Sequence, residues 1–138
     1  MRQEAVFAPM SVLALWTGFM VFMVGFSRIR AVRAGRVRRG AFRLGEGPDV
    51  PADVTVWNRN LMNLLEAPLL FYVVSISFYV THQVTPRVVT LTWIYLALRL
   101  LHSLVHVTSN RILVRLTLFG ASNVVLVWLW IRFIVRVV

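Results

Sequence analysis

The chain has 138 residues, of which 59% are hydrophobic, and its formal net charge of +10 comes from arginine alone among the basic residues. A soluble protein of this size could not bury so much apolar surface, so we expect an integral membrane protein with one domain over residues 1–138. The chain has no cysteine, which excludes disulfides and cysteine-bound metal. Basic residues flank apolar segments and form no soluble domain, so we expect no nucleic-acid partner.

Four apolar segments follow one another along the chain, at about 6–26, 57–80, 88–107 and 112–131. Each has roughly the 20 residues that a helix needs to cross the hydrocarbon core of a bilayer. None shows the alternation of a strand, so helices are expected. The short connections "THQVTPR" and "TSNR" favour antiparallel neighbours. The sequence therefore predicts an all-α, up-down bundle of four transmembrane helices.

The connection between the first two segments, residues 28–55, is strongly basic. Its seven arginines are Arg28, Arg30, Arg33, Arg36, Arg38, Arg39 and Arg43. Loops rich in arginine stay on the cytoplasmic side, and this loop outweighs Arg132 and Arg136 at the end of the last segment. We therefore expect this loop in the cytoplasm and both termini outside. The exclusive use of arginine is typical of GC-rich bacterial genomes, which favours a bacterial inner membrane.

Three polar residues interrupt the second apolar segment in the stretch "RNLMNLLE". Arg59, Asn63 and Glu66 are spaced i, i+4 and i+7, so they would share one face of a continuous helix. Ionisable groups are costly in lipid and usually serve a function there. They can also lock helices together, and Glu66 could pair with Arg59 or Arg99 in that way.

The third segment carries a similar pattern. Arg99, His102 and His106 are spaced i, i+3 and i+7, and Arg115 lies one turn into the fourth segment. With alternating helix directions, all these groups lie toward the cytoplasmic ends of their helices. Arginine binds carboxylates through two hydrogen bonds, and Glu66 suits an ammonium group, so a small zwitterionic ligand is expected. An arginine at the rim could also stabilise a thiolate.

The two histidines offer an alternative chemistry. His102 and His106 could bind a metal ion, with Glu66 as a third ligand. Two histidines at helical spacing are a weak signal, so we expect no metal. Asn123, in the middle of the fourth segment, is interpreted as a residue that hydrogen-bonds between helices.

Two motifs resemble those of a known family. The stretch "RNLMNLLE" matches an R-x-x-x-N-x-x-E signature of a second helix, and "RLLHSLVHVTSNRILVR" resembles an arginine with ring-bearing residues, followed by a fourth-helix arginine. With the four segments and the basic first loop, nearly the whole chain resembles the MAPEG superfamily, the membrane-associated proteins in eicosanoid and glutathione metabolism. Within it, the chain is similar to bacterial-type relatives of the microsomal glutathione transferases.

The resemblance implies a homotrimer that binds glutathione, as co-substrate, between subunits near the cytoplasmic face. By resemblance, the charged ends of glutathione would be held by Arg59, Asn63 and Glu66. The same pocket would be lined by Arg99 and His102, and either Arg38 or Arg39 would reach in from the loop.

Two further positions carry the chemistry that the resemblance implies. Arg115 matches the arginine that would stabilise the glutathione thiolate. His106 stands where glutathione-using members commonly carry tyrosine. A neutral imidazole can still donate one hydrogen bond, so His106 is kept as a binding residue.

The resemblance implies a glutathione-dependent transferase or peroxidase that acts on lipophilic electrophiles or hydroperoxides arriving from the bilayer. Two alternatives remain open. One is a non-catalytic binding or scaffold protein that keeps the fold and the pocket. The other is a small proton-coupled exporter, but such exporters carry their glutamate in the first segment, which here contains no acidic residue.

Overall fold

The computed structural model describes residues 2–43 and 45–137, and all regular structure within these residues is helical. The elements in chain order are η1 (Gln3–Val6), α1 (Phe7–Arg33), η2 (Arg39–Phe42), α2 (Ala52–Leu65), α3 (Ala67–Val80), α4 (Pro86–Val107) and α5 (Ile112–Val137). Four helical segments are long and apolar enough to cross a membrane: Gln3–Arg33, Ala52–Val80, Pro86–Val107 and Ile112–Val137. The expected all-α membrane fold is therefore confirmed.

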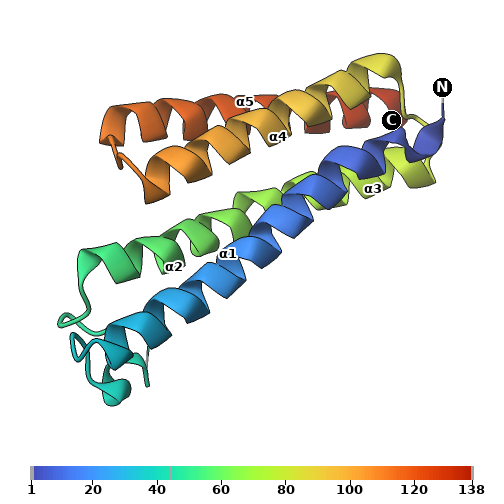
Figure 1. The fold of residues 1–138 in the computed structure, drawn as a ribbon. Coiled ribbons are helices and arrows are strands. Elements are labelled where there is room, and N and C mark those ends of the chain that lie inside the picture. The colour runs from blue at the N-terminus through green and yellow to red at the C-terminus, as the bar shows by residue number, and fades with distance from the viewer. Residues whose placement is uncertain (1, 44, 138) are drawn as a thin grey trace.

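The helices run up and down between two ends of the molecule (Figure 1). One end holds the N-terminal region, the last turns of α5 and the turn between α3 and α4, and the other holds the α1–α2 connection and the α4–α5 turn. Helix α1 packs on α2, and α4 packs on α5 as a hairpin. The hairpin joins the rest of the bundle through contacts of α4 with α1 and α2, and of α5 with α3.

Apolar side chains from the long helices form the core. Phe71 of α3 stacks on Tyr95 of α4 with ring centroids 4.4 Å apart, and both are fully buried with Leu13 and Met20 of α1. Large apolar side chains such as Phe22 are exposed on the outer surface. An apolar exterior over a packed interior is the arrangement that a bilayer stabilises.

The second membrane segment is broken in the middle, where the sequence predicted a continuous helix. Glu66 leaves the helical conformation, with φ −80° and ψ −92°, and separates α2 from α3. Pro68 is the physical cause, because it has no N–H to donate to the carbonyl of Leu64 and its ring crowds that carbonyl. The break interrupts the helix face that Arg59, Asn63 and Glu66 were expected to share.

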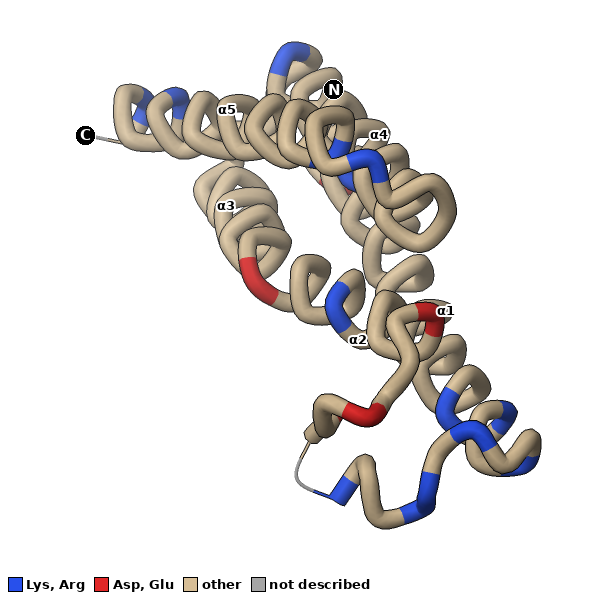
Figure 2. The backbone as a smooth tube through the Cα atoms, turned by 90° about the vertical axis from the view of Figure 1, so that its left-hand side faces the viewer, with Lys and Arg blue, Asp and Glu red and all other residues tan. Residues whose placement is uncertain are grey.

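The basic connection between α1 and α2 is folded onto the ends of both helices. A small core of Ala31, Val37, Val50 and Val54 holds it in place. Arg36 also forms a bidentate ion pair with Asp53, with distances of 2.7 and 2.9 Å between the guanidinium and the carboxylate. This pair links the connection to the first turn of α2. Figure 2 shows basic residues gathered along this connection and the adjoining end of α1.

Candidate functional site

A polar cleft of about 480 Å³ opens between α2, the end of α4 and the start of α5. Its lining residues Asn110 and Arg115 place it at the end of the bundle that holds the α4–α5 turn (Figure 1). Its polar lining includes Thr55, Asn58, Arg59, Asn63, His106, Asn110 and Arg115. Residues from two of the predicted motifs therefore face one cavity.

Helix α2 supplies one wall through two residues one turn apart. The side chain of Asn63 donates a hydrogen bond of 3.0 Å to the backbone carbonyl of Arg59, which fixes the amide against its own helix. Arg59 is exposed, and its guanidinium forms no ion pair within the described residues. The wall therefore presents an uncompensated cation and an amide oxygen.

Helix α4 supplies the opposite wall with buried imidazoles. His102 and His106 are almost completely buried, and their rings meet edge to face with centroids 5.9 Å apart. Within the described residues, Nε2 of His102 and Nδ1 of His106 are buried without a hydrogen-bond partner. Buried polar atoms are normally satisfied, so two unsatisfied ring nitrogens beside a cavity favour a ligand or water there.

A smaller cavity of about 230 Å³ adjoins the cleft and is lined by Asn63, His102, Arg115 and Phe119, among others. It shares Asn63 and Arg115 with the cleft, so the two spaces meet at these side chains. His102, which the larger cleft leaves out, is reached through this second space. The predicted histidines thus flank two adjoining cavities.

Arg115 is held at the junction by the turn that precedes it. Its Nη1 donates a hydrogen bond of 2.6 Å to Oδ1 of Asn110. Asn110 ends the α4–α5 turn with φ +47°, a left-handed conformation that asparagine tolerates better than most residues. Sequence reasoning passed over Asn110, although an asparagine within a few residues of a helix end is a recognisable signal for such a turn.

Arg99 lies behind the cleft and is fully buried between α4 and α5. Its guanidinium donates hydrogen bonds of 3.1 Å to the hydroxyl of Tyr95 and to the amide oxygen of Asn123. It also lies 5.0 Å from the ring centroid of Phe119. Arg99 therefore ties α4 to α5 through neutral partners, and Asn123 makes the expected bond between helices.

A buried hydrogen-bonded cluster, which the sequence analysis missed, joins three helices next to the site. Ser103 Oγ accepts hydrogen bonds from Nε1 of Trp16, at 2.9 Å, and from Nδ2 of Asn60, at 2.7 Å. Asn60 follows Arg59 on α2. Ser103 follows His102 on α4. The cluster fixes the two walls relative to each other.

Besides the buried Arg99, three predicted site residues lie elsewhere in the chain. Glu66 is exposed at the α2–α3 break and does not line the cleft. Arg38 is exposed just before η2, and Arg39 lines a separate groove on α1. The chain thus gathers Arg59 and Asn63 with the α4 histidines and Arg115 around the two cavities, and leaves the other four predicted residues outside them: Arg38, Arg39, Glu66 and Arg99.

The described residues contain no group of three or more His, Cys, Asp or Glu side chains that could hold a metal ion. The donor set around the cleft is cationic and amide-like, which suits an anionic or zwitterionic organic ligand. The chemistry of the lining therefore gives no support to the metal alternative considered for His102 and His106.

The fold and the cleft define a helical integral membrane protein with a polar site at one end of its bundle. The MAPEG family model matches residues 6–135, which is nearly the whole chain. The chain therefore belongs to the MAPEG family, membrane proteins of eicosanoid and glutathione metabolism. No curated protein and no solved structure gives a match to the sequence.

Proposed function

We propose that this MAPEG protein is a glutathione-dependent transferase or peroxidase that acts on lipophilic electrophiles or hydroperoxides. The observation that carries the proposal is the cleft in which Arg59 and Arg115 face the unsatisfied Nδ1 of His106. A tripeptide thiol with two carboxylates needs such cations, and family membership favours glutathione as that thiol.

The residues present fit most of the groups of glutathione. Arg59 can bind a carboxylate through two hydrogen bonds, and the amide oxygen of Asn63 can accept from a peptide N–H. The unsatisfied nitrogens of His102 and His106 can pair with other polar atoms of the ligand. No acidic side chain from the described part of one subunit lines its cleft, so the ammonium group of glutathione needs a carboxylate from elsewhere.

A homotrimer would supply that carboxylate, and we propose this assembly. Glu66 is exposed on a membrane-spanning segment, where an ionised group facing lipid is costly. Contact with a second subunit would cover Glu66 and bring it to a neighbouring cleft. The separation of Glu66 from the other predicted site residues within one chain supports a site shared between subunits.

Arg115 is the residue proposed to act on the thiol. A guanidinium close to a thiol favours the thiolate, which is the nucleophile in conjugation and in peroxide reduction. Asn110 holds the guanidinium in place, so little reorganisation is required when charge develops on sulfur. The second substrate would enter laterally from the bilayer, and positioning in the cleft would supply the rest of the rate.

The experiment compares thiolate formation with turnover. Glutathione added to the purified protein should produce thiolate absorbance in the ultraviolet and be consumed by an aromatic electrophile or a hydroperoxide. Arg115→Ala should lower kcat by about 100-fold or more, the usual cost of removing one group that stabilises developing charge, and weaken glutathione binding much less. The matched control is Arg111→Ala, which removes an exposed arginine one turn away.

The results separate an enzyme from the second candidate, a non-catalytic binding protein. His106 in place of tyrosine is the observation that favours the second candidate. Glutathione binding without thiolate absorbance or turnover would support it and contradict the enzyme. Equal losses of kcat and binding in Arg115→Ala would remove the thiolate role from that residue.

We also propose that the α1–α2 connection lies in the cytoplasm of a bacterium, with both termini outside the inner membrane. Seven arginines in residues 28–43 support this orientation. An impermeant thiol reagent added to intact cells should label Glu4→Cys and spare Asp49→Cys. The reverse labelling would overturn the orientation.

A further inference from the structure

A second, amphipathic groove of about 470 Å³ lies where the end of α1 meets η2. Its lining includes Gly25, Arg28, Ile29, Arg33, Arg39 and Phe42. It shares no lining residue with the polar cleft of the same chain, and of the residues that the resemblance assigns to glutathione it contains Arg39, which lies away from that cleft. The groove combines three arginines with an apolar floor, which is the composition of a site for an anionic amphiphile.

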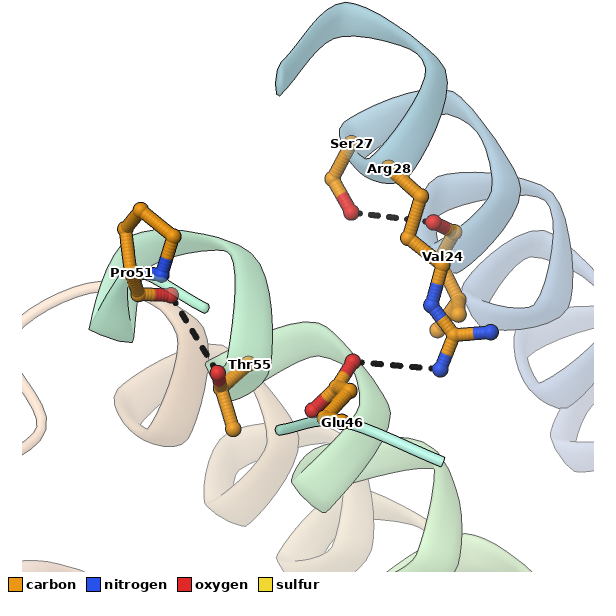
Figure 3. Close-up of polar contacts among 6 residues, drawn as sticks. All are labelled: Val24, Ser27, Arg28, Glu46, Pro51 and Thr55. Carbon is orange, nitrogen blue, oxygen red and sulfur yellow. Dashed lines mark hydrogen bonds and ion pairs between the residues drawn. The ribbon is translucent and has the colours of Figure 1, made fainter. Parts of the chain in front are cut away.

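Arg28 is held in a defined position in this groove. Its Nη2 lies 3.1 Å from a carboxylate oxygen of Glu46, as the dashed line in Figure 3 shows, and its Cζ lies 5.2 Å from the ring centroid of Phe42. Nε of Arg28 is buried and has no hydrogen-bond partner within the described residues. The guanidinium is thus oriented in advance and keeps an unused donor.

The segment that carries Arg39 and Phe42 is also fixed. Phe42 packs against the small core that contains Ala31 of α1 and Val50 before α2. Arg39 is the first residue of η2, and Val37, two residues earlier, packs with Ala31 of α1 in the same small core. The basic and apolar sides of the groove are therefore parts of one packed unit.

The remaining charge in the groove is uncompensated. Arg33 and Arg39 are exposed and take part in no ion pair among the described residues. Among the described residues no acidic side chain lines the groove, and Glu46 contacts Arg28 from outside that lining. Anions are therefore attracted to this site, and a phosphate group can accept hydrogen bonds from several guanidinium groups.

The apolar floor lies on the membrane side of these arginines. Ile29 is exposed there, and Phe26 and Phe22 are exposed about one and two turns earlier on α1. At Gly25 a Cβ atom would meet no other atom within 4 Å, so the floor is open at this position. A free phosphate would occupy only the basic side of the groove, whereas a phospholipid can also place an acyl chain along this apolar floor.

We propose that the α1–η2 groove binds one anionic glycerophospholipid. Its phosphate contacts Arg33 and Arg39 beside the fixed guanidinium of Arg28, and its acyl chain runs along Ile29 and Gly25 toward the middle of the membrane. The apolar surface before Arg28 and the basic surface after it place the groove at the level of the headgroups. The lipid would join α1 to the α1–α2 connection.

The test measures phospholipid retained by the full-length protein. Protein in nanodiscs with equal amounts of phosphatidylglycerol and phosphatidylcholine is extracted into mild detergent, and bound lipid is counted by native mass spectrometry. Wild type should retain phosphatidylglycerol selectively, at one per subunit. A variant with Arg33→Gln and Arg39→Gln should retain it about ten-fold less than a control with Arg30→Gln and Arg43→Gln, which loses the same charge outside the groove.

Gly25→Leu gives an independent variant that keeps every charge. Its side chain enters open space on a helix, so the subunit should fold, and it should displace the acyl chain and lower retention. Equal retention in the two arginine variants would reduce the effect to general surface charge and overturn the proposal. Full retention of phosphatidylglycerol in Gly25→Leu would also overturn the proposal. So would a rise in the melting temperature of the protein with inorganic phosphate that equals the rise with phosphatidylglycerol. A wild-type protein that retains no lipid selectively, because a second subunit covers the groove, would overturn it as well.

Discussion

The imidazole of His102 on α4 meets the backbone of Arg115 on α5, with Nδ1 3.1 Å from the Arg115 carbonyl oxygen. A carbonyl oxygen only accepts hydrogen bonds, so Nδ1 carries the proton and a neutral ring leaves Nε2 as an acceptor. That Nε2 is buried without a partner beside the smaller cavity. The contact therefore fixes both the orientation of the ring and the kind of ligand atom it can receive.

This contact should also stabilise the α4–α5 hairpin. His102→Phe keeps an aromatic ring and removes the donor, which leaves the Arg115 carbonyl without this bond. We expect the free energy of unfolding to fall by about 1 kcal/mol. The measurement is reversible denaturation in detergent without ligand. A variant as stable as wild type would show that the hydrogen bond contributes nothing to folding.

Ser103 should matter more than its small size suggests, because it accepts from two helices at once. Ser103→Ala would leave the donors of Trp16 and Asn60 buried and unpaired. We expect a loss of about 1–2 kcal/mol in unfolding free energy and weaker glutathione binding, since the cluster positions both walls of the cleft.

The matched control for this cluster is Ser77→Ala. The hydroxyl of Ser77 donates only to the carbonyl of Val73 in its own helix, at 2.9 Å, so its removal should cost little. Equal stability of the two variants would contradict the role assigned to the Ser103 cluster.

Part of this architecture could be predicted from the sequence. Apolar runs of the right length indicated the four membrane segments, and the i, i+4 spacing brought Arg59 and Asn63 to one face, because a regular helix preserves such spacing. The break at Glu66 was missed because Pro68, which lies within the apolar segment, was not considered as a residue that interrupts a helix.

The neighbours of the site were harder to predict. Asn60, Ser103 and Trp16 lie far apart in the sequence and meet only through helix packing, so no spacing rule connects them. The groove at Arg28 depends on how the α1–α2 connection folds back, and the sequence indicated only that this connection is basic. Local pattern predicted the helices, and tertiary packing decided which polar groups meet.

Glu66 should contribute to ligand binding and little to the folding of the subunit. It is exposed, and Arg99, which could have been its buried partner, pairs with Tyr95 and Asn123. Glu66→Gln without ligand should therefore melt within a few degrees of wild type. Glutathione should raise the melting temperature of wild type by mass action and fail to raise that of Glu66→Gln.

The outcome of this melt distinguishes the two roles considered for Glu66. A ligand-free variant that unfolds or dissociates early would assign Glu66 to helix locking or assembly. Normal stabilisation by glutathione would exclude it from the site. Glu4→Gln, which neutralises an exposed acid at the opposite end of the bundle, is the control.

The most direct test of the central claim is the affinity of the purified protein for glutathione, measured by isothermal titration calorimetry with wild type, Arg59→Ala and Arg87→Ala. Arg59 lines the cleft without an ion pair in the described residues, whereas Arg87 is exposed in the first turn of α4 at the far end. Loss of a charge-assisted contact should weaken binding by about ten-fold or more in Arg59→Ala, with Arg87→Ala unchanged. No binding by wild type, or equal binding by all three proteins, would contradict the assignment of this cleft to glutathione.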